Sequence, residues 1–143
     1  MSQQDTRALV ADLYASYGRR DFDRVAELIH DDIDWVIYGP VEVFPFQGPR
    51  KGKRAVLEAL GAIAKDYVLK TYAPELMIVD GDRAAVLSDV SFLQRATDRT
   101  LRFWLANFLR FQDGRVIEFR EFSNTFDVVE QALGHWIDVK PHE

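Results

Sequence analysis

The chain has 143 residues, which suits one domain with a single core, so we expect one domain over residues 1–143. The net charge of −5, with one short basic run at Gly48–Arg54, argues against a surface that binds nucleic acid. The absence of cysteine excludes disulfides, zinc thiolates and a cysteine nucleophile. The N-terminal residues lack the pattern of a signal peptide and no apolar run approaches a membrane span, so we expect a cytoplasmic protein that does not bind membranes.

The first half of the chain predicts three helices and one strand. Helical spacing of apolar residues indicates a helix from Asp5 to about Arg19, and Asp21 is suited to cap a second, short helix. Asp32–Tyr38 is typical of a strand, and the prolines and glycines of residues 39–52 predict a long loop. A third helix is expected over Lys53–Asp66.

The second half predicts a meander of strands and one last helix. Short turn-like segments separate the strands, which are expected near Leu69–Val79, Arg83–Gln94, Leu101–Gln112 and Arg115–Phe126, and the helix spans Asp127 to about Leu133. This segregated order is α+β: a curved antiparallel sheet with helices packed on one face.

Two neighbouring strands each carry one polar residue on an otherwise apolar face, Asn107 on the first and Glu121 on the second. A three-residue loop, Asp113–Arg115, sets the register between these strands. The pairs that this loop predicts are Phe111 with Ile117, Leu109 with Phe119, and Asn107 with Glu121.

A carboxyl on a buried sheet face must raise its pKa, find hydrogen-bond donors or face a hydrated cavity. Such a carboxyl is a candidate general acid or base near neutral pH. Two simpler interpretations stay open. Asn107 and Glu121 satisfy only one another, or Glu121 pairs with Arg102 or Arg120 at a sheet edge.

The opposite face of the strand near Leu101–Gln112 also carries apolar residues: Trp104, Ala106 and Phe108. A strand that is apolar on both faces is expected to have both faces buried against other parts of the protein or another copy of it. We therefore expect a homodimer that buries the outer sheet face, with a more fully wrapped monomer as the alternative.

Aromatic residues cluster around the first strand and the loop after it. Trp35 and Tyr38 on the strand, with Phe44 and Phe46 on the loop, are candidates for the apolar wall and lid of a pocket, or else ordinary core anchors. The run His30–Asp32 contains metal-ligand types, but sequential residues rarely converge on one ion, so we expect no metal site.

Three stretches together resemble one known family: "FDRVAELIHDDIDW", "GPRKGKRAVLEAL" and "FLRFQDGRVIEFREFSNTFDVVEQAL". They are similar to the SnoaL-like group of the superfamily named for nuclear transport factor 2, over nearly the whole chain. The resemblance implies a cone-shaped α+β barrel with a deep pocket at its open end, and homodimers are common in the superfamily. Relatives include steroid isomerases, polyketide cyclases, limonene epoxide hydrolases, dehydratases and non-catalytic binding or accessory proteins.

The steroid isomerases imply several site positions. Their catalytic carboxylate falls on Ile37, so their base is missing here. Their helix-one tyrosine falls on Leu13, beside Tyr14 and near Tyr17, which are the candidate hydrogen-bond donors. Their oxyanion-binding acid falls on Asn107, which can still donate through its amide.

The epoxide hydrolases imply an acid at Glu121, together with an arginine and a second acid on the preceding meander strand. Asp89 and Arg95 are there, but at odd positions. A two- or four-residue turn after that strand would instead point Ser88, Val90 and Phe92 inward. Other SnoaL-like chains often carry His at position 107 and Asp at position 124, where this chain has amides.

We therefore expect a protein that needs no cofactor and binds a small, largely apolar or ring-containing molecule. As an isomerase, cyclase or dehydratase, it would use Glu121 to move a proton and Asn107 to orient the substrate or stabilise charge on oxygen. The alternative is a non-catalytic ligand-binding or accessory protein. The expected ligand-contacting residues are Tyr14, Tyr17, Trp35, Ile37, Phe44, Phe46, Val90, Phe92, Phe103, Leu105, Phe119 and Ser123.

Overall fold

The computed structural model describes residues 1–141, which contain four helices and six strands. No helix within that range is long and apolar enough to cross a membrane. The elements in chain order are α1 (Gln3–Gly18), α2 (Phe22–Glu27), β1 (Ile29–Ile37), β2 (Gly48–Lys51), α3 (Lys53–Asp66), β3 (Tyr67–Asp80), β4 (Arg83–Gln94), β5 (Arg99–Gln112), β6 (Arg115–Ser123) and α4 (Thr125–Leu133).

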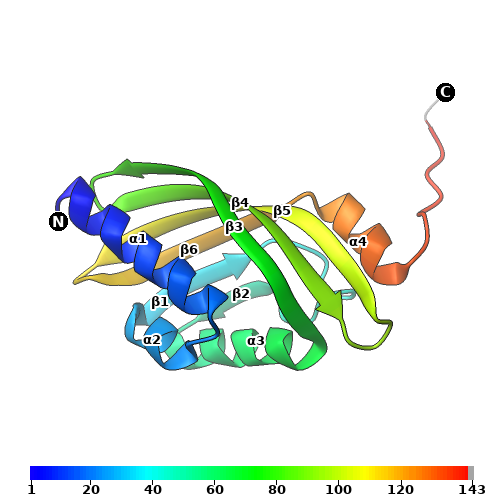
Figure 1. The fold of residues 1–143 in the computed structure, drawn as a ribbon, viewed down its shortest axis with the longest axis horizontal. Coiled ribbons are helices and arrows are strands. Elements are labelled where there is room, and N and C mark those ends of the chain that lie inside the picture. Colours follow the sequence, from blue (N-terminus) through cyan, green and yellow to red (C-terminus); the bar gives the residue numbers. More distant parts are fainter. Residues whose placement is uncertain (142–143) are drawn as a thin grey trace.

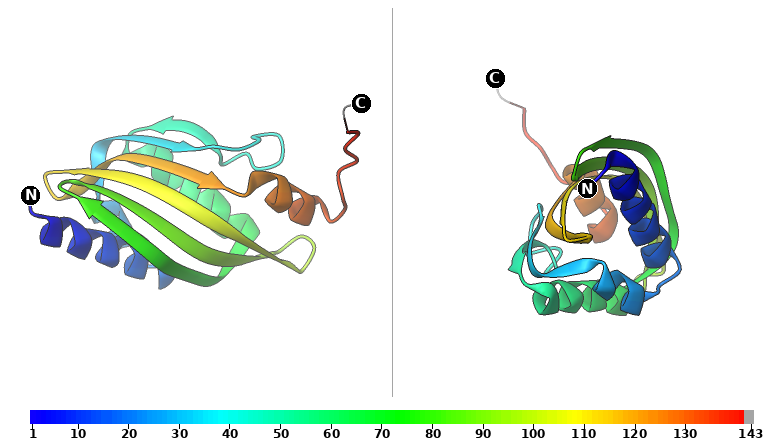
Figure 2. Two further views of the ribbon diagram at one scale, coloured as in Figure 1. Left: turned by 90° about the horizontal axis from the view of Figure 1, so that it is seen from above. Right: turned by 90° about the vertical axis from the view of Figure 1, so that its left-hand side faces the viewer.

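The six strands form one curved sheet in the order β2-β1-β6-β5-β4-β3 (Figure 1). All neighbours are antiparallel except β1 and β6, which are parallel. Helix α1 packs against β3 and β4, while α3 contacts β1 and β3. The end-on view in Figure 2 shows the sheet curling around α1, with α3 along the remaining side. This confirms the predicted α+β fold and places the core inside the curve of the sheet.

The helix ends carry residues that ordinarily cap helices, and α1 begins two residues before the predicted start at Asp5. Ser2 accepts from the backbone N–H of Asp5, and the Asp5 side chain accepts from the Ser2 N–H, which forms a capping box for α1. Asp21 caps α2, as predicted, by accepting from the Arg24 N–H. Gly134 takes a left-handed φ of 78° directly after α4.

The hairpin between β5 and β6 corrects one part of the predicted register. The turn has two residues, Asp113 and Gly114, and both have positive φ, 54° and 72°. Phe111 therefore pairs with Val116 and not with Ile117, which is an extra residue in β6. This β-bulge restores the predicted alignment further along, because one additional residue compensates for the shorter turn. Leu109 pairs with Phe119, and Asn107 pairs with Glu121, as predicted.

The hairpin between β4 and β5 settles which face of β4 is buried. Gln94 pairs with Arg99 across a four-residue turn, residues 95–98. Ser88, Val90 and Phe92 consequently lie on the inner face and are buried. The predicted loop 39–52 differs from the structure in one respect, since its last part forms the short strand β2 beside β1.

Candidate functional site

A cavity of about 120 Å³ lies within the curve of the sheet, between its concave face and the helices. Its lining is almost entirely apolar and rich in aromatic rings. The expected site residues that line it are Tyr14, Tyr17, Trp35, Ile37, Phe44, Phe46, Phe92, Phe103, Leu105, Asn107, Phe119, Glu121 and Ser123. Val90 is different, because it is fully buried in the core and is not part of the lining.

Four polar side chains from four elements meet at one wall of this cavity. The Tyr14 hydroxyl on α1 donates to Asn107 Oδ1 at 2.6 Å, and the Tyr72 hydroxyl on β3 donates to the same oxygen at 3.3 Å. Asn107 Nδ2 on β5 donates to Glu121 Oε1 on β6 at 2.9 Å. The two phenols occupy the amide oxygen, so the amide nitrogen faces the carboxyl.

The network is held in place by packing as well as by hydrogen bonds. Asn107 is only 1% exposed, so its amide cannot exchange these partners for bulk water. The rings of Tyr14 and Tyr72 lie 5.6 Å apart between centroids, and those of Tyr17 and Tyr72 lie 5.5 Å apart. These tilted contacts restrain the directions in which the hydroxyls point.

Burial raises the pKa of Glu121 from 4.5 to about 7, and the hydrogen bond from Asn107 lowers it only in part. The carboxyl therefore exchanges protons near neutral pH. Burial also raises the pKa of Tyr14 and Tyr72 well above the ordinary range, and the charge of Glu121 adds to that effect. Both phenols stay protonated and act as donors.

Nothing in the lining compensates a negative charge on Glu121. Across residues 1–141, the lining side chains include no lysine, arginine, histidine or aspartate. The predicted alternative in which Glu121 pairs with Arg102 or Arg120 is wrong. Arg102 pairs with Asp89 at 2.8 Å on the outer face, and Arg120 pairs with Asp34 at 3.4 Å.

Comparison with known proteins identifies the family. A model of the SnoaL-like domain matches residues 10–119, which is more than half of the chain. The chain belongs to the SnoaL-like domain family. This confirms the family that the sequence motifs predict.

Solved structures agree with that assignment. A provisionally named isomerase from Rhodopseudomonas palustris is 37% identical to this SnoaL-like protein and has a TM-score of 0.82, with 94% of this chain and 100% of that chain covered. An NTF2-like protein of unknown function from Burkholderia pseudomallei is 20% identical, with a TM-score of 0.82 and coverage of 92% and 98%. An LEH-like epoxide hydrolase from M. tuberculosis is 16% identical, with a TM-score of 0.75 and coverage of 92% for each chain. The last two show the shared fold alone. No functionally curated protein matches the chain.

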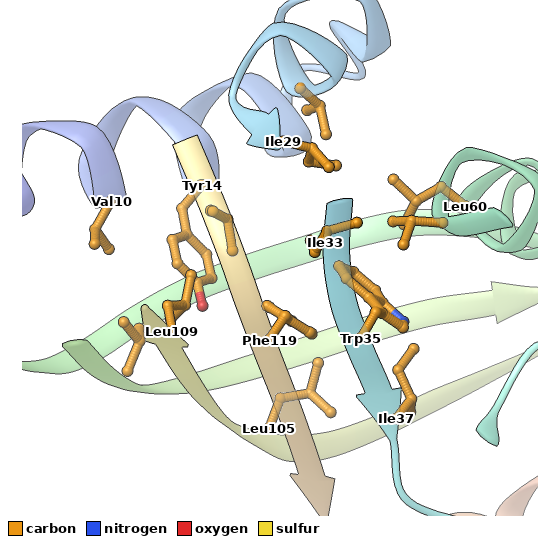
Figure 3. Packing of buried hydrophobic residues seen from close by; sticks show 14 of the residues in the cluster. Val10, Tyr14, Ile29, Ile33, Trp35, Ile37, Leu60, Leu105, Leu109 and Phe119 are labelled. Atoms are coloured by element: carbon orange, nitrogen blue, oxygen red, sulfur yellow. The ribbon is translucent and has the colours of Figure 1, made fainter. Parts of the chain in front are cut away.

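The SnoaL-like cavity has a stacked aromatic wall. The ring of Trp35 on β1 lies on the ring of Phe119 on β6, with centroids 3.9 Å apart and planes 13° from parallel. Figure 3 shows these two residues side by side, with Tyr14 reaching toward the sheet from α1. The pairing of Trp35 with Phe119 in the parallel β1–β6 ladder explains this placement.

The loop after β1 and α4 both contribute to the lining of the cavity, and Figure 2 shows them at the same end of the sheet. Phe44 is 3% exposed and packs in a separate apolar cluster with Leu101 and with Val128 and Val129 of α4. Phe46 contacts this cluster from the cavity side. The loop is thus anchored through its aromatic residues.

Other sequence candidates lie away from the cavity. Asp89 is on the outer face in its pair with Arg102, and Arg95 lies in the exposed turn after β4. Within the described part of the chain, no group of three or more His, Cys, Asp and Glu side chains could hold a metal ion.

Sequence reasoning missed one member of the polar network, Tyr72. Its strand, β3, has register shifts on either side of it, between Leu69 and Thr71 and between Pro74 and Leu76. Each shift moves the following residues to the other face, so simple alternation does not identify the inward positions. Pro74, which is uncommon within a strand, is the sequence signal of such an irregularity.

Proposed function

We propose that this SnoaL-like protein binds a small, largely apolar carbonyl compound in its cavity and catalyses a proton transfer on it without a cofactor. The observation that carries the proposal is a carboxyl with a pKa of about 7 in an apolar cavity, hydrogen-bonded to an amide that two phenols orient. Proton transfer next to a carbonyl is the common step of isomerisation, cyclisation and dehydration.

In this mechanism the deprotonated Glu121 removes a proton from the carbon next to the carbonyl. Asn107 Nδ2 holds Glu121 Oε1, which leaves Oε2 for the substrate. The second N–H of Asn107 donates to the substrate oxygen as negative charge develops there. The protonated Glu121 then returns the proton to another carbon or to the leaving oxygen. The provisional isomerase name of the R. palustris relative supports this class of reaction.

Proton transfer can be tested before the natural substrate is known. We expect the protein to accelerate the exchange of the α-protons of 1-tetralone in D₂O, followed by ¹H NMR, with a rate that rises with pH through about 7. The Glu121→Gln variant should lose this exchange but keep much of the binding. The matched control is Glu118→Gln on the outer face of the same strand, which should exchange as the unmodified protein does.

A non-catalytic ligand-binding role is the second candidate, and the amide at position 107 favours it because an amide cannot exchange a proton near neutral pH. Binding of 1-tetralone with no exchange above the buffer rate, and equal binding by Glu121→Gln, would support this role and exclude the first.

We further propose that two copies associate through the outer sheet face. Phe108 is 50% exposed and Phe122 is 46% exposed there, and Tyr38 stacks on Phe122 at 4.5 Å. Leu76 and Leu87 pair across β3 and β4 and extend this apolar surface. Sedimentation equilibrium should give the mass of two chains, and Phe108→Asp should give the mass of one. A monomeric unmodified protein would refute the dimer.

A further inference from the structure

The cavity wall contains a second polar group that the proposed proton transfer does not use. The indole Nε1–H of Trp35 has no hydrogen-bond partner among residues 1–141, although Trp35 is only 7% exposed and lines the cavity. A buried N–H without a partner costs about 1–3 kcal/mol. Since indole nitrogen is only a donor, what it needs is an acceptor.

A rotation of the Trp35 side chain cannot easily bring its N–H to an acceptor in the protein. The Trp35 ring lies flat on the Phe119 ring at 3.9 Å, and a change of rotamer would break this stack. The neighbouring cavity residues Ile33, Ile37 and Leu60 offer only apolar side chains. Among the described lining residues, Gln47 Oε1 is also a buried acceptor without a donor, but it forms no hydrogen bond with the indole N–H. A molecule within the cavity can supply the acceptor.

The position of Trp35 relative to Glu121 limits the size of that molecule. Trp35 pairs with Phe119, and Glu121 lies two residues further along the same face of β6. The backbone positions of Trp35 and Glu121 are therefore offset by about 7 Å along the sheet, because that is the separation of residues two apart on one strand. A molecule with a single ring that carries substituents at opposite ends spans such a separation.

Charge restricts the chemistry of the acceptor. Glu121 is the one carboxylate in the described lining, and no basic side chain accompanies it. An anionic ligand would add a second uncompensated negative charge in a region of low dielectric, which is unfavourable. The acceptor is thus a neutral oxygen, such as an ether, hydroxyl or carbonyl group.

We propose that the cavity selects an uncharged ring compound with two polar ends, one held by Glu121 and Asn107 and the other an oxygen that accepts from Trp35 Nε1–H. This assignment of substrate class rests on the proposed function. It makes Trp35 a specificity-determining residue, in addition to an element of the apolar wall.

Three matched compounds test this inference: 4-methoxyacetophenone with two neutral oxygens at opposite ends, acetophenone with one, and the anion 4-acetylbenzoate. Each is titrated into ¹⁵N-labelled protein, and the Trp35 indole signal is assigned with Trp35→Phe. We expect 4-methoxyacetophenone to shift the Trp35 N–H signal downfield and to bind about fivefold more tightly than acetophenone, the contribution of one hydrogen bond. The anion should bind most weakly at pH 8.

Trp35→Phe keeps an aromatic ring on Phe119 and removes the N–H donor together with part of the indole ring. The smaller ring affects both ketones alike, so the loss of the donor should weaken the binding of 4-methoxyacetophenone about fivefold more than that of acetophenone. Trp136→Phe, at 84% exposure after α4, is the matched control and should change neither.

Equal weakening for both neutral ketones, or an unmoved Trp35 N–H signal in the bound state, would overturn the inference and leave the proposed function standing. Tighter binding of the anion, or no binding of any of the three compounds, would also overturn it. The exchange of the α-protons of 1-tetralone tests the proposed proton transfer independently of these binding measurements.

Discussion

Replacement of Glu121 by glutamine should change how stability depends on pH. The native state holds the Glu121 proton with a pKa of about 7, whereas the unfolded chain releases it near 4.5. Between these values the native state carries more bound protons than the unfolded state, so stability falls as pH rises. The difference corresponds to a loss of about 3 kcal/mol by pH 8. Glutamine keeps an oxygen for the Asn107 donor and does not titrate, so the variant avoids this loss.

The assay is urea unfolding of both proteins from pH 4 to pH 8.5, followed by tryptophan fluorescence. The quantity to plot is the free energy of unfolding of the unmodified protein minus that of Glu121→Gln, because distant titrating groups cancel in this difference. It should be constant below pH 4.5 and decline until about pH 7. A difference that stays flat, or rises, over this interval would refute the burial argument for Glu121.

Glu118→Gln provides a control of opposite sign. The hydrogen bond from Arg110, at 3.0 Å, lowers the pKa of Glu118 on the outer face of β6. A lowered pKa stabilises the native state above the unfolded pKa, and this contribution is lost as pH falls. The corresponding difference for Glu118 should therefore increase with pH.

Three further predictions concern the polar network and the packing of Phe44 against α4. Tyr14→Phe should lower the free energy of unfolding by about 1–2 kcal/mol in urea, because Asn107 Oδ1 loses its shorter hydrogen bond. The side-chain carboxyl ¹³C shift of Glu121 should titrate with a midpoint near 7 and be missing in Glu121→Gln, while a midpoint near 4.5 would contradict a buried carboxyl. Phe44→Ala should cost about 3–5 kcal/mol in urea and speed amide hydrogen exchange in α4, since Phe44 is buried against that helix.

Matched surface variants control these experiments. Tyr38→Phe removes a phenol hydroxyl from a residue that is 44% exposed, and Phe126→Ala truncates a ring on α4 that is 54% exposed. Each should change the free energy of unfolding by less than about 0.5 kcal/mol. If the surface variants lost as much free energy of unfolding as Tyr14→Phe and Phe44→Ala, burial would not explain the losses of those two variants.

The opposition of Asn107 and Glu121 could be predicted from local rules, because strand alternation has a period of two and a short turn with Gly114 joins the strands. The predicted turn was nevertheless one residue too long. The bulge at Ile117 adds one residue to β6, so Asn107 still pairs with Glu121 although the turn is shorter. The position of the bulge depends on how the sheet bends, and strand alternation does not describe that bending.

The convergence of Tyr14 and Tyr72 on Asn107 could not be read from the sequence. Tyr72 lies 35 residues from Asn107 and Tyr14 lies 93 residues from it, so no local pattern relates them. Their meeting depends on the curvature that brings β3 and α1 over the concave face of β5. The stacking of Trp35 on Phe119 likewise requires the parallel β1–β6 pairing, which joins two strands that are distant in the sequence.

The sequence by itself determined the order of helices and strands except for the short strand β2. It also determined the family and the presence of one carboxyl and one amide on an apolar sheet face, because each of these depends on residue type and short-range spacing. Only the tertiary structure decided that the carboxyl is uncompensated, that two phenols orient the amide, and that the Trp35 N–H is left without a partner. Burial and hydrogen-bond satisfaction are properties of the whole enclosure, and they arise when remote segments pack together and exclude water.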